Sequence, residues 1–181
     1  GNPWTTSFTE DSFGNIWIGT YRNGTFCFHK NQTPFQKSMS GKNIECMSTD
    51  HSGNYWIGSL NGEVCVLDST QKQIMGKTIF PNDMIHTIYG QESSNKVWVG
   101  TMHGLYEAWI ESNKQIVYQK TPGINIPSIR SIVQDSCFLW IASYNNGVTL
   151  YNYSTQQSVV TYKTDSEVLP LPSNTIRTIL K

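Results

Sequence analysis

Short runs of large apolar residues, each bounded by polar turns, recur along the whole chain. The most regular of these runs are four related tetrapeptides of the form W-I/V-G/A-T/S, which begin at Trp17, Trp56, Trp98 and Trp140. Their tryptophans are 39, 42 and 42 residues apart. A fixed period of this length indicates a repeat architecture, in which each unit is one supersecondary element.

Each unit predicts four strands. A short apolar stretch (44–48, 85–89 or 129–133) precedes the tryptophan strand, and the turn between them has Asp first and Gly fourth in DSFG (11–14) and DHSG (50–53), as a type I turn favours. Beyond the tryptophan strand, a glycine turn, a third β-rich run, a polar turn and a last strand follow. Four-stranded antiparallel units of ~40–45 residues in tandem predict an all-β protein built of β-propeller blades.

The predicted blades cover residues 4–40, 41–81, 82–123 and 124–165, and 166–181 would begin a fifth. Within each W-I/V-G/A-T/S run, the tryptophan and the next residue point to opposite faces, yet both are large and apolar. Such a strand needs cover on both faces, as stacked blades provide. We interpret the following glycine, or Ala142 in the fourth unit, as a place where neighbouring backbone comes close.

The last residues resemble the inner strand of another blade. Residues 175–180 (TIRTIL) follow a polar LPSN turn, as an inner strand would. An unpaired inner strand exposes a β-edge, which native folds avoid. We therefore expect the chain to be part of a larger propeller. The alternative is a closed four-bladed ring in which the last strand overlaps or replaces the first, at residues 5–9.

Composition narrows the possible partners. Lys and Arg number 13 and Asp and Glu also 13, so no net charge attracts a phosphate backbone and nucleic acid is not expected as a partner. No run approaches the ~18 apolar residues of a membrane span, so a membrane would be reached only through a longer parent chain. The four cysteines have no zinc-ligand spacing, and neither a metal nor a cofactor is expected. Cys27 and Cys65 occupy equivalent positions on neighbouring blades, too far apart for a predicted disulfide.

The pattern D-x-x-G-x-x-W-I-G-T, followed by Gly, two strands and L-P-x-N, resembles the two-component regulator propeller repeat. It is carried by residues 11–20, 50–59 and 171–174, whereas the third unit has Gln91 in place of Asp and the fourth lacks the turn glycine. The resemblance implies the periplasmic sensor region of a hybrid two-component regulator of the Bacteroidetes type, with oligosaccharides as signals. It also implies that the complete propeller has seven blades, of which this chain is a part, with a kinase in the parent chain and a possible homodimer.

Two sets of residues are candidate ligand contacts. The first lies in the loops that join the second and third strands of each blade, where Tyr can cover a sugar ring and Asn can bond its hydroxyls. The alternative for this set is that tight turns favour such residues. The loop candidates are Tyr21, Arg22, Asn23, Asn61, His103, Tyr144 and Asn145.

The second set lies one per blade on the predicted inner strands, flanked by apolar residues: Glu45, His86, Arg130 and Arg177. Equivalent positions on inner strands should point together, so these side chains either line a polar channel or contact a ligand. The sequence shows no Ser-His-Asp or Cys-His pair at a catalytic spacing, no glycine-rich phosphate loop and no distinct pair of carboxylates. We therefore expect no enzyme activity in this segment. A polysaccharide-active enzyme and a plain protein-interaction propeller remain the alternatives.

Overall fold

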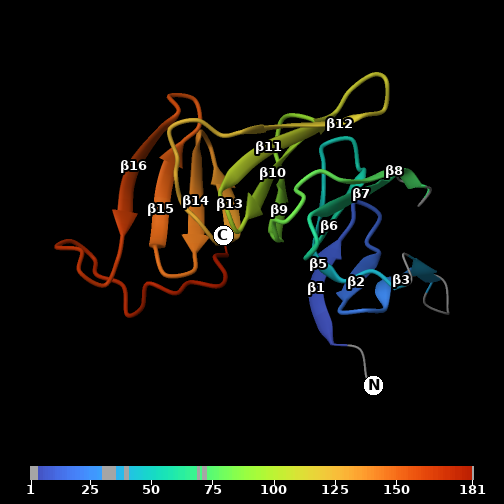
Figure 1. Ribbon diagram of the computed structural model, residues 1–181, viewed down its shortest axis with the longest axis horizontal. Coiled ribbons are helices and arrows are strands. Elements are labelled where there is room, and N and C mark those ends of the chain that lie inside the picture. Colours follow the sequence, from blue (N-terminus) through green and yellow to red (C-terminus); the bar gives the residue numbers. More distant parts are fainter. Residues whose placement is uncertain (1–3, 30–35, 39–40, 69, 71–72, 181) are drawn as a thin grey trace.

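The computed structural model describes residues 4–29, 36–38, 41–68, 70 and 73–180. Within these residues it contains sixteen strands in four separate antiparallel sheets, each built of four consecutive strands (Figure 1). This arrangement confirms the predicted all-β architecture of four-stranded blades. No helix in this part of the chain is long and apolar enough to cross a membrane.

The strands of the first two sheets follow the predicted order, from the inner strand outward. The first sheet contains β1 (Thr5–Glu10), β2 (Ile16–Thr20), β3 (Gly24–Phe28) and β4 (Gln36–Ser38). The second contains β5 (Ile44–Thr49), β6 (Tyr55–Ser59), β7 (Glu63–Leu67) and β8 (Gln73–Thr78).

The other two sheets repeat this order, and the innermost strands β1, β5, β9 and β13 contact one another in succession. The third sheet contains β9 (Ile85–Gly90), β10 (Lys96–Thr101), β11 (Leu105–Ile110) and β12 (Ile116–Lys120). The fourth contains β13 (Ile129–Asp135), β14 (Phe138–Ser143), β15 (Gly147–Asn152) and β16 (Gln157–Tyr162).

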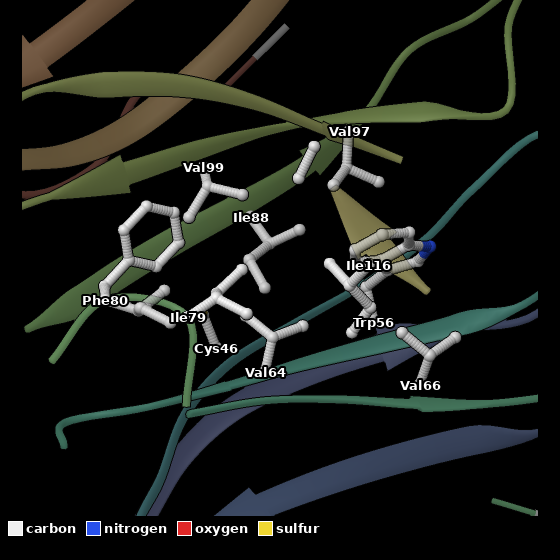
Figure 2. Packing of buried hydrophobic residues seen from close by; sticks show 12 residues of the cluster. Cys46, Trp56, Val64, Val66, Ile79, Phe80, Ile88, Val97, Val99 and Ile116 are labelled. Atoms are coloured by element: carbon white, nitrogen blue, oxygen red, sulfur yellow. The ribbon is translucent and has the colours of Figure 1, made fainter. Parts of the chain in front are cut away.

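The hydrophobic core lies between the sheets. Trp56 is fully buried and packs with Val64 and Val66 of its own blade against Val97 and Val99 of the next (Figure 2). Its neighbours in sequence, Tyr55 and Ile57, lie instead in the cluster shared with the first blade. Both faces of the strand are therefore buried, as predicted. Trp17, Trp56 and Trp98 each pack at one interface only, the one toward the following blade, and the strand neighbours of Trp56 and Trp98 fill the other interface.

The fourth tryptophan lies in a different environment. Trp140 is only half-buried and stacks on Tyr162 of its own sheet, with ring centroids 6.1 Å apart. On the opposite face of β14, Leu139 and Ile141 are fully buried against the third blade. The other tryptophans pack against the following blade, and no described blade lies on the side that Trp140 faces.

The glycine two residues after each buried tryptophan lies close to side chains rather than to backbone. A Cβ on Gly58 would lie 2.7 Å from Ile85 Cγ2 of the next blade and 2.7 Å from Cys46 Sγ of its own inner strand. Gly100 is crowded in the same way by Ile129 and Thr87. The expected close approach is therefore real, but the interpretation as a backbone contact is wrong.

The turn aspartates have a role that the turn alone does not explain. Asp50 accepts the indole N–H of Trp56 at 2.9 Å, and its other oxygen accepts the backbone N–H of Asn54 at 3.0 Å. Asp11 accepts the indole N–H of Trp17 at 3.1 Å in the first blade. The carboxylate thus closes the turn and also satisfies a polar group that packing has removed from water.

The third repeat has lost this bond. Gln91 replaces the aspartate and donates to Glu107 Oε1 at 2.8 Å, on its own sheet. The indole nitrogen of Trp98 is buried and has no hydrogen-bond partner within the described part of the chain. The packing position of the indole is nevertheless kept, toward the fourth blade.

The last residues do not form a strand. Residues 175–180 have no ladder partner in the described chain, and the start of a fifth blade stays a prediction. They still contact the fourth blade, because Ile179 N–H donates to Ser131 Oγ of β13 at 3.2 Å and Ile176 N–H donates to the Ser143 carbonyl, at the end of β14, at 3.1 Å. This segment does not replace β1, which pairs with β2, so strand replacement does not close a four-bladed ring here.

The cysteines carry thiols rather than disulfides. Cys27 and Cys65 are buried in the same apolar cluster between the first two blades, and Cys46 is buried in the next. Burial raises the pKa of the Cys27 thiol to about 11, with the charge of Asp11 acting in the same direction. These side chains therefore behave as small apolar core residues.

Candidate functional site

The second residue of each inner strand is a β-bulge. In the second blade, Ile44 pairs with Ser59 and Cys46 pairs with Gly58, which leaves Glu45 without a partner in the ladder. The same shift occurs at the equivalent position in the other three blades. A bulge leaves its extra residue unpaired and redirects its side chain. The four bulge residues are Thr6, Glu45, His86 and Arg130.

These bulges open onto one hollow of about 440 Å³. Besides the four bulge residues, it is lined by Tyr144 from the turn between β14 and β15 and by two residues of the final segment, Arg177 and Thr178. The structure thus brings together the whole inner-strand set predicted from the sequence, and it adds one member of the loop set. All four blades therefore contribute residues to the lining of this hollow.

Thr6 and Thr178 are the lining residues that sequence reasoning missed. Thr6 follows Thr5 just as Glu45 follows Ile44, so the repeat register could have identified it. Its hydroxyl donates to the carbonyl of Ile44 at 2.6 Å, a contact between the first and second inner strands. The signal was weak because the first strand lacks the apolar flanking residue that marks the other three.

Arg130 connects the hollow across two blades. One of its terminal nitrogens, Nη1, lies 3.1 Å from Nδ1 of His86, on the preceding inner strand. The guanidinium carbon also lies 5.5 Å from the centre of the Tyr144 ring, at cation–π distance. Its Nε is buried and has no hydrogen-bond partner among the described residues. The guanidinium is therefore oriented by two uncharged neighbours.

Burial sets the protonation of the two titratable groups beside Arg130. Burial and the positive charge of Arg130 lower the pKa of His86 to about 4, although Asp83 acts in the opposite direction. His86 is consequently neutral near pH 7, and its Nδ1 can accept the proton that Arg130 donates. Burial raises the pKa of Glu45, and Arg130 partly offsets this. The hollow therefore holds two guanidinium groups and a single carboxyl group.

Most of the predicted loop set lies outside this hollow. Tyr21 stacks on Trp4 with ring centroids 6.4 Å apart, and the Arg22 guanidinium lies 5.0 Å from the Tyr21 ring. Arg22 has a φ of 73°, a conformation typical of tight turns. Asn23 is half-buried beside them. These three residues form a local cluster at the first blade.

Asn61 and Asn145 accept hydrogen bonds from other residues of the chain. The Asn61 carbonyl oxygen accepts the hydroxyl of Ser59, and Asn145 Oδ1 accepts the hydroxyl of Thr175 at 2.8 Å. Asn145 has a φ of 70°. The Asn61 side chain thus bonds within its own turn, the Asn145 side chain bonds the final segment, and the two interpretations of the loop set stay open.

His103 lies at a second hollow, of about 300 Å³, between the second and third blades. Its Nδ1 is 3.0 Å from Asp83 Oδ1, and Phe80, Tyr106 and Tyr118 form the aromatic part of the lining. Asp83 also accepts the backbone N–H groups of Met84 and Met102, so its carboxylate holds the connection between the blades. No group of three or more His, Cys, Asp or Glu suited to a metal ion occurs in the described ranges.

Comparison with known proteins agrees with this fold. Residues 1–22 match the family described as Two component regulator propeller. No curated protein matches the sequence. The resemblance of the repeat to two-component regulator propellers is thus confirmed at the first repeat.

Three solved structures illustrate the likeness. The extracellular domain of the hybrid two component system BT3049 from B. thetaiotaomicron aligns with 99% of this chain at 24% identity and a TM-score of 0.78, and the chain spans 24% of that protein. PorZ, a surface component of the type-IX secretion system of Porphyromonas gingivalis, aligns with 97% of this chain and 29% of its own, at 14% identity and a TM-score of 0.74. An auxiliary nutrient binding protein from Bacteroides thetaiotaomicron aligns with 87% and 46%, at 14% identity and a TM-score of 0.69.

Proposed function

We propose that this chain is a ligand-sensing propeller segment in the periplasmic part of a hybrid two-component regulator. It binds a saccharide in the hollow formed by the four bulges and passes the signal to a kinase elsewhere in the parent chain. The observation that carries the proposal is the convergence of polar bulge side chains from four blades on one hollow. The likeness to the BT3049 extracellular domain supports the setting.

The lining suits a saccharide. Tyr144 presents a half-exposed aromatic ring, which can cover the apolar face of a pyranose. Thr6 and Thr178 offer hydroxyls, Glu45 offers acceptor oxygens and the arginines offer donors. The volume of about 440 Å³ lies within the ~300–1,000 Å³ of small-ligand sites. The hollow therefore combines a stacking surface with donors and acceptors that face it from several sides.

The position of the hollow also suits signal relay. Arg130 of β13 donates a hydrogen bond to His86 of β9 across one blade interface, and Ile179 of the final segment donates to Ser131 of β13. A ligand that contacts several inner strands binds one relative arrangement of the blades better than another, and so shifts their equilibrium. The shift would be passed through the remaining blades and the dimer geometry of the parent protein.

The number of carboxyl groups that line the hollow favours binding over catalysis. Glycoside hydrolysis generally needs two carboxyl groups facing the scissile bond, whereas Glu45 is the one carboxyl group that lines this hollow among the described residues. We expect calorimetry with a panel of plant and host oligosaccharides on the full-length protein to give binding without turnover. Hydrolysis of any of these glycans would contradict the proposal, as would the absence of binding to all of them.

A further inference from the structure

We propose that the saccharide recognised in this hollow carries an acidic group, a carboxylate or a sulfate ester, which binds between Arg130 and Arg177. The inference rests on the proposed function and names the chemical class of its ligand. It comes from the way in which charge is distributed and paired around the hollow.

The two arginines are not neutralised by the protein. Neither guanidinium forms an ion pair with a carboxylate of the described residues, whereas Lys42 and Lys96 pair with Glu63 and Glu107 at 2.7 and 2.9 Å. Two guanidinium groups therefore face one carboxyl group across the same hollow, and His86 adds no charge near pH 7. A ligand with one negative charge would balance this excess.

Arg130 is arranged as an anion-binding group. It has five N–H donors in a planar fork. His86 accepts from one terminal nitrogen, Tyr144 lies against the guanidinium, and the buried Nε–H has no acceptor in the described structure. A carboxylate or sulfate can take two parallel hydrogen bonds from such a fork, which a neutral hydroxyl cannot do. The orientation is set before the ligand arrives, so little side-chain entropy is lost on binding.

Glu45 limits the number of acidic groups on the ligand. It lines the same hollow as Arg130, and the positive charge of Arg130 partly offsets the rise in the Glu45 pKa that burial causes. A polyanion would bring negative charge against this carboxyl group, whereas sugar hydroxyls can donate to it. The combination favours a saccharide with one acidic substituent over inorganic polyphosphate.

The test is calorimetry on the full-length protein with matched saccharides that differ in one group. Galactobiose is the neutral member, the same disaccharide with one of its two galactoses oxidised to galacturonate provides one carboxylate, and galactobiose 6-sulfate provides one sulfate. We expect the preferred acidic member to bind at least about tenfold more tightly than galactobiose at low salt, and the ratio to fall as salt is raised. Which acidic member binds more tightly distinguishes a uronate signal from a sulfated one.

Variants test whether the arginines cause this preference. Arg130→Gln should lower the affinity for the acidic member at least about tenfold more than the affinity for galactobiose, and so remove the acidic preference. Arg130→Lys should restore only part of it, because an ammonium lacks the fork. Arg177→Gln should reduce the preference without any risk to folding, since Arg177 is exposed. The control is Arg22→Gln, an exposed arginine outside the hollow, which should change nothing.

The outcomes separate the two proposals. Equal affinity for neutral and acidic members would overturn this inference and leave the proposed function in place. An Arg130→Gln variant that weakens both kinds of ligand equally would also overturn it, because the arginine would then have only a structural role. Absence of binding to every saccharide, neutral or acidic, would overturn the proposed function itself.

Discussion

The second and third repeats bury the same tryptophan in the same way, but they treat its indole nitrogen differently. In the second repeat, Trp56 donates to Asp50 at 2.9 Å. In the third, Gln91 turns toward Glu107, and the indole nitrogen of Trp98 is buried without a described partner. Both indoles still pack against the following blade. The apolar contact therefore determines the blade position, and the hydrogen bond adds to the stability of an arrangement already determined.

The largest effect should come from removing the indole that lies between two blades. Trp56→Ala should lower the free energy of unfolding by ~3–5 kcal/mol, as expected for deletion of a large aromatic side chain from a core. Chemical denaturation measures this. Trp140→Ala is the matched control and should cost clearly less, because Trp140 is half-buried against its own sheet. Equal losses of unfolding free energy for the two variants of the 181-residue chain would contradict the conclusion that each buried tryptophan packs against the following blade.

The next largest effect should be a difference in stability loss between the turn residue of the second repeat and that of the third. Asp50→Ala leaves the Trp56 indole N–H buried without an acceptor, and should cost ~1–3 kcal/mol. Gln91→Ala removes bonds to Glu107 and Ser94 in partly exposed surroundings and should cost under about 1 kcal/mol. The comparison is again made by denaturant titration. A Gln91 loss as large as that at Asp50 would mean that the third turn has replaced the missing bond with an equivalent one.

Acid should weaken the first interface through Asp11. Burial alone would raise the pKa of Asp11, but hydrogen bonds from Tyr55, Asn15 and Trp17 lower it to about 2, from 3.8. Because the folded pKa lies below the unfolded one, the stabilisation is complete above about pH 4 and is lost as the pH falls toward 2. The stability difference between wild type and Asp11→Asn should therefore shrink over that range. A constant difference from pH 5 to pH 2 would be inconsistent with this linkage.

The smallest expected effect concerns a bond that crosses from one blade to the next. The Tyr55 hydroxyl donates to Asp11 Oδ2 at 2.6 Å, so Tyr55→Phe should cost about 1 kcal/mol while the ring stays packed against Trp17. A double-mutant cycle with Asp11→Asn should show a coupling energy, because both changes remove the same bond. Strict additivity of the two losses would show that the hydroxyl and the carboxylate do not interact.

The sequence predicted the strands well because their chemistry is local and repeated. The inner, tryptophan and third strands were located from apolar runs and from turns with Asp first and Gly fourth. Gly14 and Gly53 do close the expected turns, with φ near 78°. The inner-strand set was also found, because repeat register alone aligns Glu45, His86 and Arg130. The bulges that turn these side chains toward one hollow left no residue signature of their own.

The loop set shows where local reasoning fails. Tyr144 and Asn145 are neighbours in one turn, yet Tyr144 lines the hollow while Asn145 bonds Thr175. Tyr21 belongs to the equivalent turn of the first blade and stacks on Trp4 instead. Residue type and turn position are the same for the two tyrosines, so only the surrounding blades distinguish them.

The repeat period, and the apolar residues on both faces of the tryptophan strands, were enough by themselves to determine four antiparallel blades that need cover on both faces, because strand periodicity is a property of the local chain. Tertiary structure alone decided which interface each tryptophan fills, which glycine is crowded by which side chain, and which polar residues meet. Those outcomes depend on blades some forty residues apart in sequence coming into contact, and no local pattern encodes the distance between them.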